Sequence, residues 1–445
     1  MEVKETLPRQ STGLSITSLR VEVVEGPEAG ATQAADADTL TIGSAPGNDL
    51  VLSDPTVSRY HLELRRVAHG IALTDLDSTN GTFVDGIRVR QGVVPAGRIL
   101  VLGATKVRIA NADDVVVSVH PGDHLGGLRG QTPVMQRLMA RIERASQSDK
   151  PVLVVGESGT GKELCARALH DLGPLARGPF ETVDCGALAP SLVASELFGH
   201  ERGAFTSADR QHVGAFERAH GGTLFLDEIG ELPPDLQTTL LGVLERRRFR
   251  RVGGRVDIPC SVRVVAATNR DLRAEVNRGT FRLDLYYRLA VVVLSLPPLR
   301  ERADDVPLLI EHFLRECGHV GPAETLFSPE ALESMRRHTW PGNVRELRNV
   351  IESTVAMGEP PDFGETRPAT AELPQAPGEP GGSELLDSVL DLTYKVARDR
   401  LLRRFEAKYL ERLLARTKGN VSQAAREAQM DRSHLTELIA RHNLK

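Results

Sequence analysis

The sequence predicts a multidomain chain in which an all-β domain precedes an α/β domain and an all-α tail. Between residues 18 and 110, short runs such as TLTIG, HLELRR and RILVLG alternate apolar with polar residues, and turn residues separate them. This period of two is typical of a β-sandwich. Between residues 125 and 357, apolar runs such as PVLVVG and VRVVAATN alternate with helical segments, which predicts parallel strands covered on both faces. Residues 387–445 have a helical pattern.

Two linkers separate these domains. The chain of 445 residues is too long for a single hydrophobic core. Segment 111–124 is polar and contains glycine, and segment 358–386 is rich in Pro, Gly, Glu and Ala, which favours a flexible tether. We therefore predict domains at 18–110, 125–357 and 387–445.

The charge of the chain is unevenly distributed. The net charge is −5, yet residues 391–445 hold 13 Lys or Arg against 7 Asp or Glu. A basic terminal module on an acidic body suggests a nucleic-acid contact, although a solvated helix face explains the charge equally well.

The cysteines and the apolar runs indicate the compartment. Cys165, Cys185, Cys260 and Cys317 form no CxxC or Cys/His cluster, so we expect buried thiols in a reducing environment. No run approaches the length of a membrane span, and the N-terminus has no signal-type apolar region. The expected location is the cytoplasm, without a membrane partner.

A candidate nucleotide site begins with GESGTGKE at 156–163, between the apolar run PVLVV and a helical segment. Glycines let such a loop turn its N–H groups toward phosphate, and the helix N-terminus adds its dipole. Lys162 would reach the β- and γ-phosphates, while Glu163 stands where the general pattern has a hydroxyl for Mg²⁺. The predicted ATP-binding residues of the loop are Gly156, Glu157, Ser158, Gly159, Thr160, Gly161, Lys162 and Glu163.

The second half of this site is GGTLFLDE at 221–228, an apolar strand that ends in two carboxylates. We expect Asp227 to hold Mg²⁺ and Glu228 to orient or deprotonate the attacking water. A carboxylate placed for water favours ATP hydrolysis over transfer to another substrate. The predicted activity is therefore that of an ATPase.

Polar residues further along complete the predicted site. Thr268 and Asn269 follow the run VRVVAA and could sense the γ-phosphate. Arg282 and Arg288, in FRLDLYYRLA, could stabilise transition-state charge in a neighbouring subunit, although a surface ion pair is an equally good explanation for each. Arg345 projects from the helix that follows WPGN.

The loop RGAFTSADR at 202–210 places Phe205 among small and polar residues, where no core periodicity would bury it. A surface turn with a stray aromatic would explain the loop if it stood alone.

Together these motifs carry a resemblance. They are similar to the AAA+ domain of bacterial enhancer-binding proteins, which activate sigma-54 RNA polymerase, over residues 125–357. The motifs are GESGTGKE, ELFGHERGAFTSA, GGTLFLDEIGELP, ATNRDL, FRLDLYYRL, LPPLRER and WPGNVREL. The resemblance implies a P-loop ATPase with a small helical subdomain that assembles into a homo-oligomeric ring, typically a hexamer. It also implies that GKE is the normal end of the loop.

The resemblance assigns roles to particular residues. It implies that Arg282 and Arg288 act in trans and that Arg345 is a sensor. The sigma-54 contact would be formed by Gly203, Ala204, Phe205, Thr206, Ser207 and Ala208. Two positions depart from the family pattern: Ser207 replaces a glycine of GAFTGA, and Asp184 replaces an asparagine that positions the catalytic glutamate.

Residues 40–86 resemble a forkhead-associated domain through TIGSAPGNDLVLSDPTVSRYH and STNGTFVDG. Such domains bind phosphothreonine peptides, which implies a phosphothreonine protein or a Ser/Thr kinase as the partner. The phosphopeptide-binding residues would be Ser58, Arg59, Thr79 and Asn80. His61 more naturally braces its loop, and Ser44 stands where the family has an arginine. The alternative is a sandwich that serves only for assembly contacts.

The segment GNVSQAAREAQMDRSHLTELIARHN resembles a Fis-type helix-turn-helix. The start of the second helix is where such a module contacts base edges. The predicted DNA-binding residues are Arg432, Ser433, His434 and Thr436.

The combined prediction is a regulator that binds enhancer DNA, receives a phosphothreonine-linked signal and uses ATP and Mg²⁺ to remodel sigma-54 RNA polymerase. Two alternatives remain. One is an AAA+ unfoldase, which would need no DNA-binding tail. The other is a DNA-binding regulator or adaptor of the same fold that no longer productively engages sigma-54, which Ser207 and Asp184 keep open.

Overall fold

The computed structural model describes residues 13–35, 39–67, 70–187, 189–205 and 208–358, together with Leu410, Leu413, Thr417, Val421, Gln423 and Ala424. The chain divides into two compact units, Met1–Thr366 and Arg367–Lys445. In the second unit, Leu410, Leu413 and Ala424 are buried.

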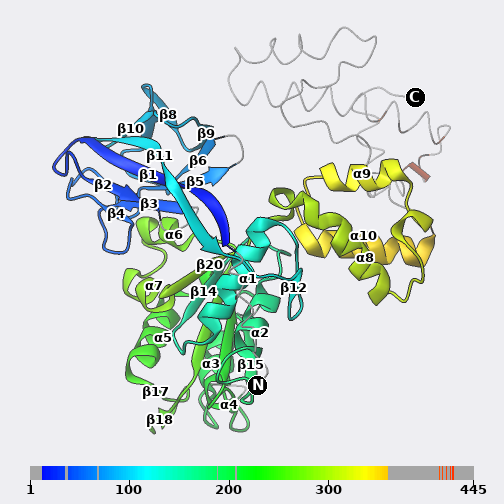
Figure 1. Ribbon diagram of the computed structural model, residues 1–445. Helices are drawn as coiled ribbons and strands as arrows, with labels where there is room; N and C mark the ends of the chain where they lie inside the picture. The colour runs from blue at the N-terminus through cyan, green and yellow to red at the C-terminus, as the bar shows by residue number, and fades with distance from the viewer. Residues whose placement is uncertain are drawn as a thin grey trace, which may run out of the picture. The chain divides into compact units, whose positions relative to one another are not determined.

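The N-terminal domain is a β-sandwich of two sheets (Figure 1). One sheet has the order β2-β1-β11-β10-β7-β8 and the other the order β4-β3-β5-β6-β9. Alternate residues of the strands, such as Leu40 and Ile42 or Leu62 and Leu64, are buried between the sheets. The strands are β1 (Gly13–Glu25), β2 (Thr32–Ala34), β3 (Thr39–Gly43), β4 (Leu50–Val51), β5 (Leu62–Val67), β6 (Gly70–Asp75), β7 (Thr82–Val84), β8 (Ile87–Val89), β9 (Gln91–Val94), β10 (Ile99–Leu102) and β11 (Thr105–Ser118).

The longest strands of the sandwich extend beyond the sequence-based boundaries. β1 and β11 pair antiparallel from Gly13 opposite Ser118 to Glu25 opposite Lys106. β11 therefore continues through residues 111–118, which the sequence placed in a linker. A polar composition did not stop the strand because its partner β1 continues beside it.

The α/β domain is built on a five-stranded parallel sheet with the order β15-β16-β19-β14-β20. A short antiparallel pair, β12 and β13, precedes it, and another, β17 and β18, projects between β16 and β19 in the sequence. The strands are β12 (His124–Leu125), β13 (Leu128–Arg129), β14 (Val152–Val155), β15 (Phe180–Asp184), β16 (Thr223–Asp227), β17 (Arg248–Phe249), β18 (Ile258–Pro259), β19 (Arg263–Thr268) and β20 (Val292–Ser295).

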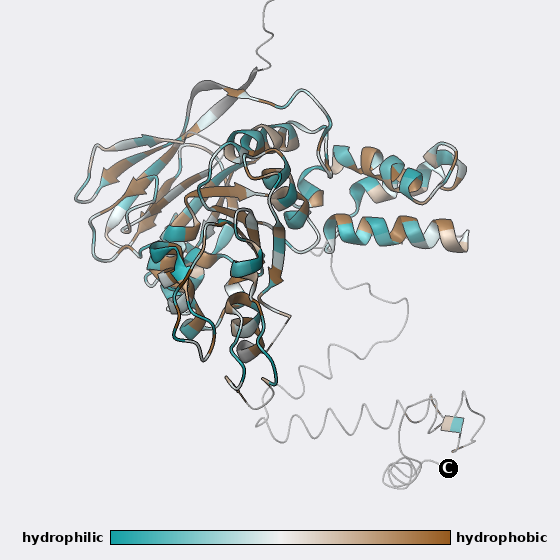
Figure 2. Cartoon of the chain, turned by 90° about the horizontal axis from the view of Figure 1, so that it is seen from below, coloured by the Kyte–Doolittle hydropathy of each residue, from teal (hydrophilic) through white to brown (hydrophobic). Residues whose placement is uncertain are grey.

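Helices cover both faces of this sheet. Since successive residues of a strand point to opposite sides, each strand contacts both layers of helices. Val152 and Val154 of β14 pack with α1 and α2, whereas Leu153 packs on the other side with α3 to α7. Figure 2 shows the strands as predominantly hydrophobic. The helices are α1 (Pro133–Ser146), α2 (Lys162–Asp171), α3 (Pro190–Phe198), α4 (Ala215–Arg218), η1 (Ile229–Glu231), α5 (Pro234–Arg246), α6 (Leu272–Arg278) and α7 (Leu283–Leu289).

A helical subdomain follows β20 and has its own core around Trp340, Phe327 and Leu347. The indole Nε1 of Trp340 donates to the carbonyl of Met335, so this buried ring keeps its hydrogen bond. The elements are η2 (Leu299–Glu301), η3 (Ala303–Asp305), α8 (Val306–Glu316), η4 (Ala323–Thr325), α9 (Pro329–Arg337) and α10 (Asn343–Met357).

The predictions on the cysteines and on membrane spans can be compared with the described residues. Cys165, Cys185 and Cys260 are buried, but Cys317, which follows α8, is partly exposed, so the prediction of four buried thiols is wrong for that residue. Within the described ranges, no helix is both long and apolar enough to cross a membrane.

Candidate functional site

The loop from Gly156 to Gly161 connects β14 to α2 at the carboxyl edge of the sheet. Gly159 and Gly161 have φ angles of 77° and 105°, which favour glycine. A Cβ at Gly159 would also lie 2.2 Å from the carbonyl oxygen of Gly342 in the helical subdomain. The loop is therefore shaped by glycine and closely backed by that subdomain.

Lys162, the first residue of α2, joins the two halves of the predicted nucleotide site. Its side chain is 7% exposed, and its Nζ donates to the carbonyl of Gly156 at 3.1 Å. The same Nζ lies 3.3 Å from Oε1 of Glu228, which follows β16. The structure thus brings together motifs about seventy residues apart in the sequence.

The two carboxylates at the end of β16 differ in their surroundings. Burial raises the pKa of Asp227, and the nearby carboxylates of Glu228 and Asp184 add to this rise. Glu228 has φ 49°, and its Oε2 accepts from the backbone N–H of Asn269 at 3.1 Å. Asn269 therefore orients the carboxylate of Glu228 through its backbone.

Asp227 has the chemistry expected of a magnesium ligand, since Mg²⁺ prefers oxygen donors and usually retains water and substrate phosphates in its shell. Groups of three or more His, Cys, Asp or Glu side chains that could hold a metal are absent from the described residues. The carboxylate of Asp227 therefore fits a Mg²⁺ ion that binds together with the phosphates of a nucleotide better than an ion coordinated by protein groups alone.

Asp184 lies beside Asp227 on the neighbouring parallel strand, in direct register. Its Oδ1 accepts from the backbone N–H groups of Gly186 at 2.8 Å and Ala187 at 3.1 Å. The carboxylate is thus engaged by its own loop.

Asn343, at the start of α10, is a site residue that the sequence analysis missed. It is fully buried, and its backbone is left-handed with φ 54°. Its Nδ2 donates to Oε2 of Glu157 at 3.1 Å and to the carbonyl of Ser158 at 3.0 Å, while its Oδ1 accepts from the N–H of Leu299 at 2.8 Å. The available signal was Pro-Gly-Asn before a helix, a sequence that favours a tight turn.

Two arginines of the helical subdomain also contact this loop. Arg345 donates from Nη1 to the hydroxyl of Ser158 at 3.1 Å. Arg300, another residue that the sequence analysis missed, forms a bidentate pair with Glu157 at 2.6 and 2.8 Å. The hydrogen bonds from Arg300 hold the pKa of Glu157 below its ordinary value.

Arg282 and Arg288 lie at the two ends of α7, on the side of the sheet opposite α2. Arg282 pairs with Asp284 at 2.6 Å, and Nη2 of Arg288 donates to the carbonyl of Leu244 at 2.9 Å. Both side chains are exposed. Their described contacts keep them at the surface.

The loop of residues 202–210 is described on both sides of Thr206 and Ser207, which lie outside the described residues. Gly203 has φ 78°, and its N–H donates to the carbonyl of Ala208 at 2.8 Å. The ring of Phe205 is partly buried, edge-to-face against His200 at 4.8 Å. No core periodicity buries Phe205, but His200, just before the loop, partly covers its ring.

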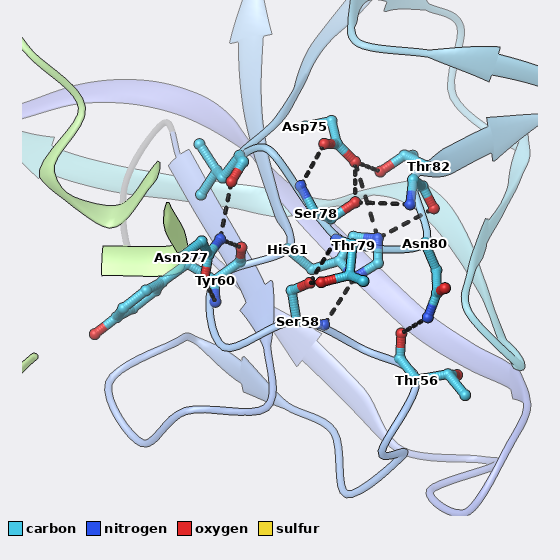
Figure 3. Close-up of polar contacts among 12 residues, drawn as sticks. Thr56, Ser58, Tyr60, His61, Asp75, Ser78, Thr79, Asn80, Thr82 and Asn277 are labelled. Carbon is cyan, nitrogen blue, oxygen red and sulfur yellow. Dashed lines mark hydrogen bonds and ion pairs between the residues drawn. The ribbon is translucent and has the colours of Figure 1, made fainter. Parts of the chain in front are cut away.

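At one end of the sandwich, the loops of residues 56–61 and 75–81 meet (Figure 3). The hydroxyl of Ser58 accepts from the N–H of Thr79 at 2.9 Å, and Nδ2 of Asn80 donates to the carbonyl of Thr56 at 2.8 Å. Arg59, Thr79 and Asn80 are exposed and Ser58 is partly exposed. The four residues predicted to bind a phosphopeptide are thus gathered at one end of the domain.

His61 lies behind this group rather than in it. Its ring is fully buried, and its Nδ1 accepts from the N–H of Ser58 at 3.1 Å. Burial lowers the pKa of His61, which favours the neutral ring that this hydrogen bond requires. His61 braces the loop.

The predicted DNA-binding residues Arg432, Ser433, His434 and Thr436 lie outside the described residues.

Four segments of the chain match models of known families. Residues 128–295 match the Sigma-54 interaction domain, and residues 300–372 match the AAA+ ATPase lid domain. Residues 401–441 match the bacterial regulatory protein, Fis family. Residues 22–113 match the cytoplasmic domain of an inner membrane component of the type III secretion system, a different description from the forkhead-associated family that the sequence suggested.

The chain is also similar to regulators of known sequence and structure. It is 38% identical over 443 residues to transcriptional regulatory protein GlrR of Escherichia coli (strain K12), covering 97% of this chain and 94% of that protein. It is 43% identical over 331 residues to DNA-binding transcriptional regulator NtrC of Azospirillum brasilense, covering 70% and 68%. The crystal structure of NtrX from Brucella abortus in complex with ATP matches with a TM-score of 0.50 and 33% identity, over 73% of this chain and 71% of that one.

A glycine-shaped loop, an acidic strand end and a helical lid define a domain of the AAA+ class that carries the sigma-54 interaction signature. The chain belongs to the family of sigma-54-dependent transcriptional regulators with a Fis-type DNA-binding module.

Proposed function

We propose that this chain hydrolyses ATP to remodel sigma-54 RNA polymerase at enhancer-dependent promoters. The observation that carries the proposal is the approach of Lys162 to Glu228, at 3.3 Å. It places a phosphate-binding lysine beside a carboxylate that can act on water. The ATP complex of the related NtrX supports the choice of nucleotide.

In this proposal the loop residues 156–163 bind the phosphates of ATP. Arg345, in the helical subdomain, acts as a sensor of these phosphates. Asp227 would hold Mg²⁺, which supplies positive charge to the phosphate oxygens when it is bound. Glu228, oriented by the N–H of Asn269, would position and deprotonate the attacking water.

A matched pair of substitutions tests the role of Glu228. Glu228→Gln keeps the shape and the acceptor for Asn269 but removes the base, so we expect hydrolysis to fall about 10²–10⁴-fold while ATP still binds. The control is Glu231→Gln, in the same turn, because Glu231 pairs with Arg270 at the surface. Unchanged hydrolysis in Glu228→Gln, or an equal loss in the control, would contradict the assignment.

The exposed positions of Arg282 and Arg288 support a homo-oligomeric ring in which each arginine serves the ATP site of a neighbour. We expect Arg288→Ala and Glu228→Gln to be inactive alone. A mixture of the two should recover part of the ATPase activity, because some subunit boundaries then combine an intact Glu228 with an intact arginine. A mixture as inactive as its components would show that the arginine does not act in trans.

The sigma-54 contact in this proposal is the loop that includes Gly203, Ala204, Phe205, Thr206, Ser207 and Ala208. The phosphothreonine input would bind at Ser58, Arg59, Thr79 and Asn80, with the exposed Arg59 supplying the positive charge for the phosphate. A phosphothreonine protein or a Ser/Thr kinase would provide that input. Enhancer DNA would be contacted by Arg432, Ser433, His434 and Thr436.

The input is tested by titrating the full chain with phosphothreonine peptides and with matched unphosphorylated peptides. We expect a preference for the phosphorylated form that Arg59→Ala weakens about tenfold or more, since a charge-assisted hydrogen bond is lost. Equal affinity for both forms would contradict the phosphothreonine input and favour a sandwich that serves only for assembly contacts.

A further inference from the structure

The two loops that carry the predicted phosphopeptide residues are also held from behind by the ATPase domain. Nδ2 of Asn277, in α6, donates to the carbonyl of Tyr60 at 2.5 Å and to the carbonyl of Leu76 at 2.8 Å. Its Oδ1 accepts weakly from the N–H of Tyr60 at 3.4 Å. Figure 3 shows this amide beside Tyr60, on the other side of the loop from the Ser58–Thr79 contact.

Asn277 completes a series of hydrogen bonds along the first loop. The carbonyl of Ser58 accepts from the N–H of Ser44, that of Arg59 from the N–H of Ala45, and that of His61 from the N–H of Leu76. The sandwich supplies these donors itself. The donor to the carbonyl of Tyr60 comes from the ATPase domain, and a buried carbonyl without its donor is costly.

The surrounding interface keeps Asn277 in place. The buried side chain of Tyr60 joins the apolar cluster of the ATPase domain and packs edge-to-face on Tyr286 at 5.4 Å. Arg278, next to Asn277, pairs with Asp77 in the second loop. The residues held by α6 are therefore direct sequence neighbours of Arg59 and near neighbours of Thr79.

We infer that Asn277 is a positioning residue of the phosphothreonine site, so that the site consists of the sandwich together with α6. One amide joins the carbonyls of two loops and fixes their spacing, while the Ser58–Thr79 hydrogen bond joins them on the exposed side. A site with fixed spacing binds its ligand with less ordering cost. This inference rests on the proposed phosphothreonine binding.

Linkage gives the inference a consequence for the ATPase. If docking on α6 favours peptide binding, peptide binding must favour docking by the same factor. The hydroxyl of Tyr287, in α7, donates to the carbonyl of Pro46 in the sandwich. Peptide binding would thus also favour docking of the sandwich on α7, the helix that Arg282 precedes and that contains Arg288.

The test is a fluorescence-anisotropy titration of the full chain with a labelled phosphothreonine peptide library, with randomised flanking residues, and with its unphosphorylated counterpart. Asn277→Asp keeps the size of the side chain but replaces both donors with an acceptor, and Asn277→Ala adds no charge. The control is Arg65→Gln, which removes a different contact of the sandwich, the pair of Arg65 with Glu301 of the helical subdomain at 2.5 Å. Thermal melting confirms that each variant is folded.

We expect both Asn277 variants to bind the phosphorylated library about tenfold more weakly, and Arg65→Gln to stay within about twofold of the unmodified chain. Unchanged affinity in folded Asn277 variants would overturn the inference. An equal loss in Arg65→Gln would also overturn it, because domain docking in general would then be responsible. If the unmodified chain does not prefer the phosphorylated library, the proposed phosphothreonine input itself fails, and the inference falls with it.

Discussion

Asn343 and Asn277 each reach from a helix of one domain into the loops of another, but they are buried to different depths. Asn343 is fully buried in a left-handed backbone and binds three partners around the nucleotide loop. Asn277 is partly exposed and joins the carbonyls of two loops. An asparagine can therefore hold loops in place both from a fully buried position and from a partly exposed one.

The two sites that these asparagines support differ in the same way. In the nucleotide site the reactive groups, Lys162 and Glu228, already contact each other within the protein. In the sandwich, Arg59, Thr79 and Asn80 are exposed, and the spacing of the two loops that carry them is set from behind. A catalytic site needs fixed reactive groups, whereas a recognition site can leave its binding groups exposed.

If the buried Asn343 contributes more to the fold than the partly exposed Asn277, Asn343→Ala should cause the largest loss of stability. It removes the donor to the Ser158 carbonyl and the acceptor for the Leu299 N–H, and it places alanine at φ 54°. We expect a loss of about 2–4 kcal/mol in the free energy of unfolding, measured in urea, with weaker ATP binding.

Asn343→Gly is the matched control, because glycine adopts the same φ without strain. It should recover part of the stability lost in Asn343→Ala but not the ATP affinity. Equal stability of the two variants would assign the whole effect to the side chain, and wild-type ATP affinity in both would remove Asn343 from the nucleotide site.

A smaller loss of stability is expected from Arg300→Ala, because the side chains of Arg300 and Glu157 in this ion pair are each about 40% exposed. Solvent screening limits the loss to below about 1 kcal/mol at pH 7. The hydrogen bonds from Arg300 lower the pKa of Glu157 from its ordinary value of 4.5. The stabilisation is therefore present above pH 4.5 and is lost as the pH falls through the lowered value.

Urea unfolding of the unmodified chain and of Arg300→Ala at a series of pH values measures this dependence. The two curves should separate above pH 4.5 and converge in acid. A difference in stability that persists unchanged in acid would mean that Arg300 acts through packing rather than through its pair with Glu157.

The smallest effect is expected from Asp184→Asn. The amide oxygen can still accept from the N–H groups of Gly186 and Ala187, so we expect a change in stability within about 0.5 kcal/mol. Asp184→Ala removes that acceptor and should cost about 1 kcal/mol. Thermal unfolding of both variants checks this, and equal losses would show that the two hydrogen bonds do not contribute.

Much of this molecule could be predicted from its sequence because the decisive patterns are local. The loop with Lys162 and the strand that ends in Asp227 and Glu228 are continuous stretches whose residue types dictate both structure and chemistry. The alternation in the sandwich is equally local.

The contacts of Asn343 with the nucleotide loop and of Asn277 with the sandwich could not be predicted, since they join residues 185 to 217 positions apart. Such contacts depend on how finished domains dock, which no short pattern encodes. The contact of Phe205 with His200 is short-range, but it follows no strand or helix periodicity. The extension of β11 beyond residue 110 depended on the length of β1, its distant partner.

Open-complex formation by sigma-54 RNA polymerase would show whether ATP hydrolysis by this chain remodels the polymerase. The assay compares the full chain with Glu228→Gln and Ser207→Gly on a sigma-54 promoter, with ATP. We predict open complexes with the unmodified chain and with Ser207→Gly, and none with Glu228→Gln. The contrary result is that the unmodified chain hydrolyses ATP without forming open complexes, while Ser207→Gly forms them. That result would contradict the proposed function and indicate a regulator that no longer engages sigma-54.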